Sequence, residues 1–363
     1  MKKIIEFFSL STVLKISLGF ILASVYYNTN SPKSIPEKTD ITSRSEASNS
    51  STTKLPDIVE KSISELEQVK FVAHDKFNER RKRIQDYCDK NSEDLELQEV
   101  NNDIKWNQDL WFDYKQKLIF CQISKVSSST WVQSLMSLNG RNIIKWNKLL
   151  KNEGLDTHQW RPEIRKRLFP LQHLQHSSFK DAKKDLLSFV FVREPFTRIV
   201  SSYHDKMIRD WSKPQFDLKW MRDEILEKYR GIKAEKNMDK PTPEEFVRYI
   251  IDSAEEKGAY QLDNHIKPIW TSCPLCSVQF DIVGHLESFD EDSAFIHDEM
   301  KLANKINWAL HAHGHQMQEK HHTSNKTDDF FAQIPQEIRQ KLYQFCKRDY
   351  DMLGYPKPKY VED

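Results

Sequence analysis

The stretch of residues 118–138 constrains the fold of this chain more than any other part of the sequence. It begins with apolar, β-prone residues, as expected of a buried strand. A short polar loop containing Lys125 and several hydroxyl side chains follows. Trp131, Leu135 and Leu138 then recur at the i, i+4, i+7 spacing of one helix face. The pattern predicts a strand, a loop and a helix in immediate succession.

A loop of this kind is suited to binding a phosphate group. The first turn of a helix offers unpaired N–H groups and the positive end of the helix dipole. Lys125 adds a full positive charge, and the hydroxyls of the loop add hydrogen-bond donors. The loop contains no glycine, so it is not a G-x-x-x-x-G-K-[ST] nucleotide loop. The alternative interpretation is a capped helix after a strand, with a lysine on the surface.

A second unit of the same kind occurs at residues 186–207. The apolar run 186–192 predicts a buried strand, Arg193 follows it directly, and Pro195 suits the first turn of a helix. Arginine can bind a phosphate in a bidentate manner that lysine cannot, although a structural salt bridge is the alternative. Two such units predict an α/β fold with a parallel sheet and a ligand at the carboxyl ends of its strands.

Composition limits the classes of partner and the use of cysteine. A formal charge of +1 with 30% charged residues argues against general nucleic-acid binding, so any polyanion must be bound by local patches. The five cysteines allow at most two intrachain disulfides, and Cys121, inside its strand, is the candidate for a free thiol. Cys273 and Cys276 could contribute to a zinc site with the histidines of 311–322, but disulfides are the preferred interpretation.

The N-terminal segment predicts entry into the secretory route. Residues 10–27 are mostly apolar, are interrupted by Lys15, and follow the basic residues Lys2 and Lys3. This predicts an uncleaved signal anchor with a cytosolic tail at 1–9. A cleaved signal peptide is the alternative, because Ala23 and Ser24 are small residues near a suitable position.

The remaining chain divides into a stem and a lumenal domain. Residues 28–100 are expected to form the stem, which is polar at first and helical in pattern from 57 to about 90. Residues 101–363 are expected to form the lumenal domain. Glycosylation sequons begin at Asn49 and Asn325.

Taken together, the motifs resemble the Golgi carbohydrate sulfotransferases of the chondroitin/dermatan 4-O-sulfotransferase and HNK-1 sulfotransferase group. Residues 121–131 are similar to that family's 5′-phosphosulfate loop, Cys-x-x-Pro-Lys-Val-Ala-Cys-Thr-Asn-Trp. Residues 191–203 match its 3′-phosphate motif, Phe-Val-Arg-x-Pro-Phe-x-Arg-Leu-Val-Ser-x-Tyr. His265, the Cys273/Cys276 pair and Glu287 match further positions, and the likeness covers roughly residues 78–355.

The resemblance implies a three-layer α/β fold with a central parallel sheet and a P-loop-like strand–loop–helix unit. It also implies a single-pass Golgi membrane enzyme with a lumenal catalytic domain, or a secreted one after signal cleavage. The donor would be 3′-phosphoadenosine-5′-phosphosulfate, with no metal. The acceptor would be a glycosaminoglycan or glycoprotein glycan, at the 4-O position of GalNAc in chondroitin or dermatan chains. No nucleic acid is implied as a partner.

The same resemblance implies roles for individual residues. Lys125 would stabilise the leaving group, and His265 would act as the base, with Glu287 as second choice. The expected donor-binding residues are Ser124, Lys125, Val126, Ser127, Ser128, Ser129, Thr130, Arg193, Arg198 and Ser201.

Three departures from the family pattern leave alternatives open. Ser124 replaces a proline, Glu194 stands where histidine is usual, and Ile266 replaces a tryptophan. They keep open a non-catalytic, glycan-binding relative with the same fold. A nucleotide-phosphate kinase is a further alternative, which the missing glycine loop and the secretory anchor argue against.

Overall fold

The computed structural model describes residues 75–94, 96–98, 109–138, 181, 183–208, 218–231, 239–299 and 326–361. All of them belong to one compact unit, Val59–Asp363. The expected anchor at 10–27, the first part of the stem, both sequon asparagines and the histidines of 311–322 lie outside the described residues. Within the described ranges, no helix has the length and apolar character needed to span a membrane.

A mixed four-stranded sheet forms the centre of the unit. Its order is β1 (Leu110–Asp113), β2 (Leu118–Cys121), β3 (Leu187–Val192) and β4 (Ile282–His285). Strands β2, β3 and β4 are parallel, whereas β1 is antiparallel to β2. The prediction of a parallel sheet is therefore right for β2, β3 and β4 and wrong for the edge. The connection 114–117 is too short for the crossover that a parallel β1–β2 pair would need.

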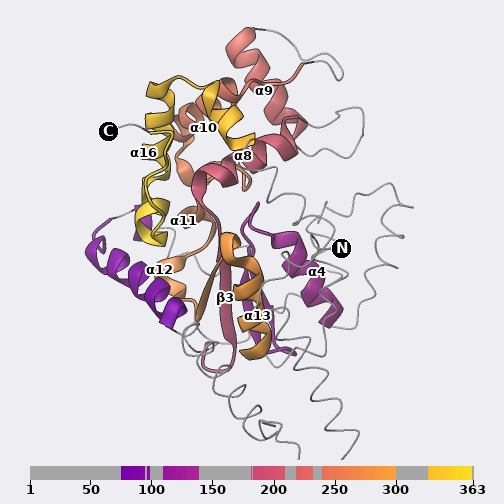
Figure 1. The fold of residues 1–363 in the computed structure, drawn as a ribbon, viewed down its shortest axis with the longest axis vertical. Coiled ribbons are helices and arrows are strands. Elements are labelled where there is room, and N and C mark those ends of the chain that lie inside the picture. Colours follow the sequence, from indigo (N-terminus) through magenta and orange to yellow (C-terminus); the bar gives the residue numbers. More distant parts are fainter. Residues whose placement is uncertain are drawn as a thin grey trace, which may run out of the picture. The chain divides into compact units, whose positions relative to one another are not determined.

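Both predicted strand–loop–helix units are confirmed. Strand β2 leads into α4 (Ser128–Leu138), and β3 leads into α8 (Pro195–Lys206). Pro195 stands at the start of α8, where its missing N–H costs no helical hydrogen bond. In Figure 1, α8 lies beyond the end of β3 from which it emerges.

One face of the sheet is covered by closely packed aromatic side chains. The Trp131 ring of α4 packs against Phe189 and Phe191 of β3, with ring centroids 4.7 and 5.2 Å away. The Phe289 ring at the start of α13 (Phe289–Glu299) lies 5.2 Å from that of Phe191. All four side chains are at most 2% exposed, so α4 and α13 bury this face with the sheet.

The opposite face is joined covalently to the segment that carries α11 (Ile269–Ser272) and α12 (Leu275–Val278). Cys121 points away from the aromatic face, because successive strand residues alternate, and it forms a disulfide with Cys273. A second disulfide joins Cys88 to Cys276. Elements therefore cover both faces of the sheet.

The expectation that Cys121 is the free thiol is wrong. The end of β2 lies beside the α11–α12 segment, so Cys121 and Cys273 come within disulfide range, with Cα atoms 6.4 Å apart. The free cysteine is Cys346, buried in α16 (Gln336–Leu353). Both members of the Cys273/Cys276 pair are in disulfides, which excludes them as zinc ligands.

Residues expected to end the stem belong to the folded unit instead. Helical residues 75–90 place Phe77 and Ile84 in the core, and Arg80 Nη1 lies 2.6 Å from Asp292 Oδ2 of α13. The helical pattern predicted from 57 to about 90 is confirmed over 75–90.

A second hydrophobic cluster lies around α8. It includes the buried faces of α9 (Lys219–Arg230), α10 (Pro243–Lys257) and α16. A capping box between Thr242 and Glu245 begins α10. The short helices η3 (Ala259–Gln261) and η4 (Leu286–Ser288) follow α10 and β4 respectively. This cluster fixes α8 from the side that faces away from the sheet.

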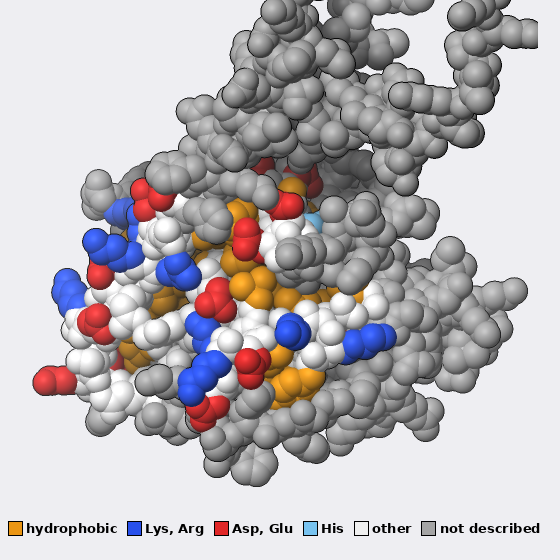
Figure 2. Space-filling view, turned by 90° about the horizontal axis from the view of Figure 1, so that it is seen from below, with side chains coloured by type: hydrophobic (Ala, Val, Ile, Leu, Met, Phe, Trp, Pro, Cys, Tyr) orange, Lys and Arg blue, Asp and Glu red, His pale blue; other side chains and the backbone are white. Residues whose placement is uncertain are grey.

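The face drawn in Figure 2 carries basic and acidic side chains interspersed around apolar ones. On the described part of this face, neither sign of charge forms a continuous track. This distribution matches the balanced composition of the chain.

The close approach of Gly284 to Phe191 generates a prediction about stability. A Cβ atom on Gly284 would lie 2.6 Å from the Phe191 ring. Gly284→Ala should therefore lower the free energy of unfolding by about 1–3 kcal/mol, the usual range for overpacking. Denaturant unfolding of the purified protein measures this change. Phe191→Leu makes room for the methyl group, so the double variant should lose less stability than the sum of the single variants. Additive losses, or a Gly284→Ala variant as stable as the wild type, would contradict this packing.

Candidate active site

The carboxyl ends of β2, β3 and β4 meet at one edge of the sheet, because these strands are parallel. The loop with Lys125 follows β2, Arg193 follows β3, and Glu287 follows β4. Arg193 Nη1 donates a hydrogen bond to the carbonyl oxygen of Lys125 at 3.3 Å. The structure thus brings together the two loops that the sequence singled out as separate phosphate-binding units.

The backbone of the first loop has an unusual conformation. Lys125 and Ser127 have φ values of 71° and 65°, in a region that residues other than glycine rarely adopt. Val126 between them is fully buried and anchors the loop to the core, so it can offer a ligand only its backbone. Backbone conformations of this kind are concentrated at functional sites. The positive φ values of Lys125 and Ser127 allow this loop to turn sharply without a glycine.

Hydroxyl groups lie where each helix begins or passes the site. Ser128, Ser129 and Thr130 form the first turn of α4, the end with unpaired N–H groups. Ser201 lies on the second turn of α8. Among the described residues, none forms a hydrogen bond with the side-chain hydroxyl of these four. They are the donors that an anion at this edge could use.

Lys125 lies in a cluster of alternating charge. Its Nζ is 3.0 Å from Asp205 Oδ2, and Lys206 Nζ is 3.7 Å from the same atom. Burial lowers the pKa of Lys125, while the Asp205 carboxylate opposes that shift. Asp205 was not among the site residues predicted from the sequence.

His265 is paired with a carboxylate two residues earlier. Its Nδ1 and its backbone nitrogen both lie 2.8 Å from Asp263 Oδ1. Burial alone would raise the pKa of Asp263, but the hydrogen bonds from His265 and the nearby Lys206 charge hold it below its usual value. A histidine oriented in this way keeps Nε2 for a substrate. The Asp-x-His spacing of Asp263 and His265 is visible in the sequence, but Asp263 was not among the predicted site residues.

Arg198 joins the Lys125 loop to the His265 turn. The residue is 2% exposed, and its guanidinium donates to three backbone carbonyl oxygens. Nε donates to the carbonyl oxygen of Ser124 at 3.0 Å, Nη1 to that of Lys267 at 2.8 Å and Nη2 to that of Asn264 at 3.2 Å. One buried side chain of α8 therefore sets the position of both loops.

The departures at Glu194 and Ile266 are accommodated by the fold. The Glu194 carboxylate accepts hydrogen bonds from the backbone nitrogens of Phe196 and Thr197 and caps α8. The Tyr350 hydroxyl donates to the same carboxylate. Ile266 is 1% exposed within the cluster around α8, so it serves as a core residue. The charge of Glu194 is therefore directed at the helix N-terminus.

Comparison with known proteins gives matches over the same region. A sulfotransferase family model matches residues 108–356, which include every candidate site residue. Carbohydrate sulfotransferase 11 of Mus musculus is 26% identical over 287 residues, 78% of this chain and 77% of that protein. Carbohydrate sulfotransferase 10 of Homo sapiens is 26% identical over 260 residues, 68% of this chain and 67% of that protein. No solved structure matches at a comparable level of significance.

The family match therefore agrees with the geometry. It covers the four-stranded sheet, the loops with Lys125 and Arg193, and the His265 turn. The chain belongs to the sulfotransferase family.

Proposed function

We propose that the protein transfers a sulfuryl group from 3′-phosphoadenosine-5′-phosphosulfate to a hydroxyl group of a glycan. The hydrogen bond from Arg193 to the Lys125 carbonyl oxygen is the observation that carries this proposal. It joins the two loops predicted to bind anions at one edge of the sheet, and a donor with phosphates at both the 5′ and 3′ positions requires two such loops. A kinase nucleotide lacks the 3′-phosphate and would not need the second.

The acceptor we propose is the 4-O position of GalNAc in chondroitin or dermatan chains. The relatives named carbohydrate sulfotransferase support a glycan as acceptor. The motif resemblance to the chondroitin/dermatan group supports this sugar and hydroxyl.

Each loop has a distinct task in the proposed reaction. The N–H groups and hydroxyls of residues 127–130 would hold the 5′-phosphate at the start of α4. Lys125 would stabilise the charge that grows on the bridging oxygen of the leaving group. Arg193 and Ser201 would bind the 3′-phosphate. Arg198, whose N–H groups bond carbonyl oxygens, would act mainly by positioning the loops.

His265 would remove the proton from the acceptor hydroxyl as that oxygen attacks sulfur. Asp263 would hold the imidazole in orientation through Nδ1 and stabilise the imidazolium that forms. Glu287 suits this task less well, because both its carboxylate oxygens already accept hydrogen bonds.

The cellular setting we propose is the Golgi membrane. A signal anchor at 10–27 with a cytosolic tail at 1–9 would place the catalytic domain in the lumen, or signal cleavage would release it. The two disulfides support an oxidising compartment.

Transfer of radiolabelled sulfate to a panel of desulfated glycans tests the proposed function. The wild-type protein should label chondroitin or dermatan, with the label on O4 of GalNAc in the released disaccharides. Lys125→Ala and Arg193→Ala should each lower kcat/KM at least 10²-fold, the scale for a lost charge-stabilising group. Lys184→Ala and Arg248→Ala are controls with side chains 70% and 42% exposed, and should transfer normally.

Two outcomes would contradict this assignment. Unchanged transfer in the Lys125 or Arg193 variant would show that the donor does not bind at this edge of the sheet. Donor binding by the wild type without transfer to any glycan would support the non-catalytic relative.

The assignment of the base gives a separate prediction. His265→Ala should lower kcat about 10²–10⁴-fold with little change in donor affinity, because it removes proton transfer and leaves both phosphate loops in place. Asp263→Asn should cause a smaller loss, since the imidazole stays but loses its charged partner. Steady-state kinetics with donor and acceptor varied separately measures both effects. A His265→Ala enzyme with a rate close to that of the wild type would rule out His265 as the base.

A further inference from the structure

We infer that Glu287 is a positioning residue that holds the Arg193 turn in the shape needed for the donor's 3′-phosphate, and that Tyr355 holds Glu287. This inference rests on the proposed function, because it takes Arg193 as the 3′-phosphate ligand. The motif likeness had left Glu287 only as a second choice for the base.

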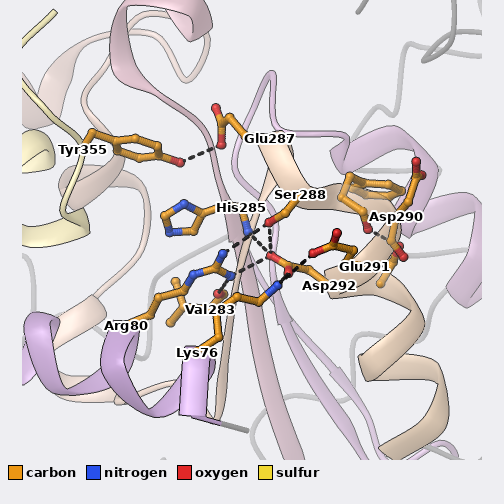
Figure 3. Close-up of polar contacts among 12 residues, drawn as sticks. Lys76, Arg80, Val283, His285, Glu287, Ser288, Asp290, Glu291, Asp292 and Tyr355 are labelled. Atoms are coloured by element: carbon orange, nitrogen blue, oxygen red, sulfur yellow. Dashed lines mark hydrogen bonds and ion pairs between the residues drawn. The ribbon is translucent and has the colours of Figure 1, made fainter. Parts of the chain in front are cut away.

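The contacts of Glu287 connect two segments far apart in the sequence. Oε1 accepts a hydrogen bond from the backbone N–H of Glu194 at 2.9 Å. Oε2 accepts one from the hydroxyl of Tyr355, which follows α16, at 3.0 Å. Figure 3 shows the Tyr355 ring directed at the Glu287 carboxylate. The carboxylate therefore bridges the turn after β3 and the C-terminal tail.

The bond to Glu194 acts on the peptide group that joins it to Arg193. Fixing this N–H fixes the plane of that peptide and with it the direction in which Arg193 leaves β3. The Glu194 side chain is held independently by the α8 cap and by Tyr350. Glu287 thus fixes the backbone of this turn, while the cap of α8 and Tyr350 fix the Glu194 side chain.

Tyr355 itself is held firmly by the elements around it. Its ring lies 4.9 Å from that of His285, whose backbone N–H donates to Asp292 Oδ2 at 2.7 Å. Arg80 Nη1 lies 2.6 Å from Oδ2 of Asp292, and Lys76 Nζ lies 2.6 Å from its Oδ1. Figure 3 shows both side chains directed at this carboxylate. Burial and the nearby Glu287 charge raise the pKa of Tyr355 well above its usual value, so its hydroxyl keeps the proton that it donates.

The same contacts make Glu287 unsuited to act as a base. A general base must direct a lone pair at the acceptor proton in the reactive complex. Both oxygens of Glu287 are instead bonded to groups that remain protonated near neutral pH. A glutamine could keep the bond from Glu194 through its carbonyl oxygen, but it could not act as a base. This difference separates the two roles.

The test compares Glu287→Ala, Glu287→Gln and Tyr355→Phe in the full-length protein. Calorimetry measures the affinity for adenosine 3′,5′-bisphosphate and for adenosine 5′-phosphate, which lacks the 3′-phosphate. Glu287→Ala should weaken bisphosphate binding by about tenfold or more, the value of one hydrogen bond to a charged group, and leave monophosphate binding unchanged. Tyr355→Phe should have a smaller effect in the same direction. Glu287→Gln should keep both bisphosphate affinity and kcat close to the values of the wild type. Glu291→Ala is the matched control, because the Glu291 side chain is 80% exposed.

Two results would overturn the inference. Bisphosphate affinity unchanged in Glu287→Ala would show that the Arg193 turn does not need Glu287. A large loss of kcat in Glu287→Gln with normal bisphosphate affinity would make Glu287 the base. If the proposed function is wrong, the wild-type protein itself should bind adenosine 3′,5′-bisphosphate and adenosine 5′-phosphate with equal affinity.

Discussion

The site depends above all on the buried guanidinium of Arg198. Its three hydrogen bonds join the carbonyl oxygen of Ser124 in one loop to those of Asn264 and Lys267 in another. Buried carbonyl groups need partners, and a planar guanidinium can serve several at fixed angles where a lysine cannot. Because Arg198 lies on α8, directly after the turn that carries Arg193, the same helix positions the Lys125 loop, the Arg193 turn and the His265 turn. None of these segments can move far without breaking a bond to this side chain.

The arrangement of carboxylates around this frame explains how an anion could bind there. The Glu194 charge is directed at the N-terminus of α8 and at Tyr350, so it does not neutralise the Arg193 turn. Asp263 is paired with His265. Asp205 is the exception, since it lies 3.0 Å from Lys125 Nζ. A bound donor would compete with Asp205 for Lys125, and this competition would bring the lysine to the leaving group only when the donor is present.

Local patterns predicted the two strand–loop–helix units, because apolar periodicity at 118–138 and 186–207 reflects the elements themselves. The Lys125 loop, Arg193 and His265 were likewise visible as motifs. Sequence patterns did not predict the antiparallel β1, the Cys121–Cys273 disulfide or the contacts of Arg198, Glu194 and Glu287. Each of these depends on which distant segment lies beside the residue, and a single sequence does not contain that information. Glu194 is an example: in the sequence it stood out only as a departure from the family pattern, whereas in the structure its carboxylate caps α8.

Arg198→Lys tests most directly whether Arg198 couples donor binding to catalysis by holding both loops. The lysine keeps the positive charge but cannot bond all three carbonyl oxygens. The measurement is donor affinity together with kcat at saturating donor and acceptor, on protein whose folding is checked by circular dichroism. We predict that both fall by about tenfold or more, because the Lys125 loop and the His265 turn lose their common partner. A loss of donor affinity alone would indicate direct contact with a phosphate, and no loss in either would show that the two loops are positioned without Arg198.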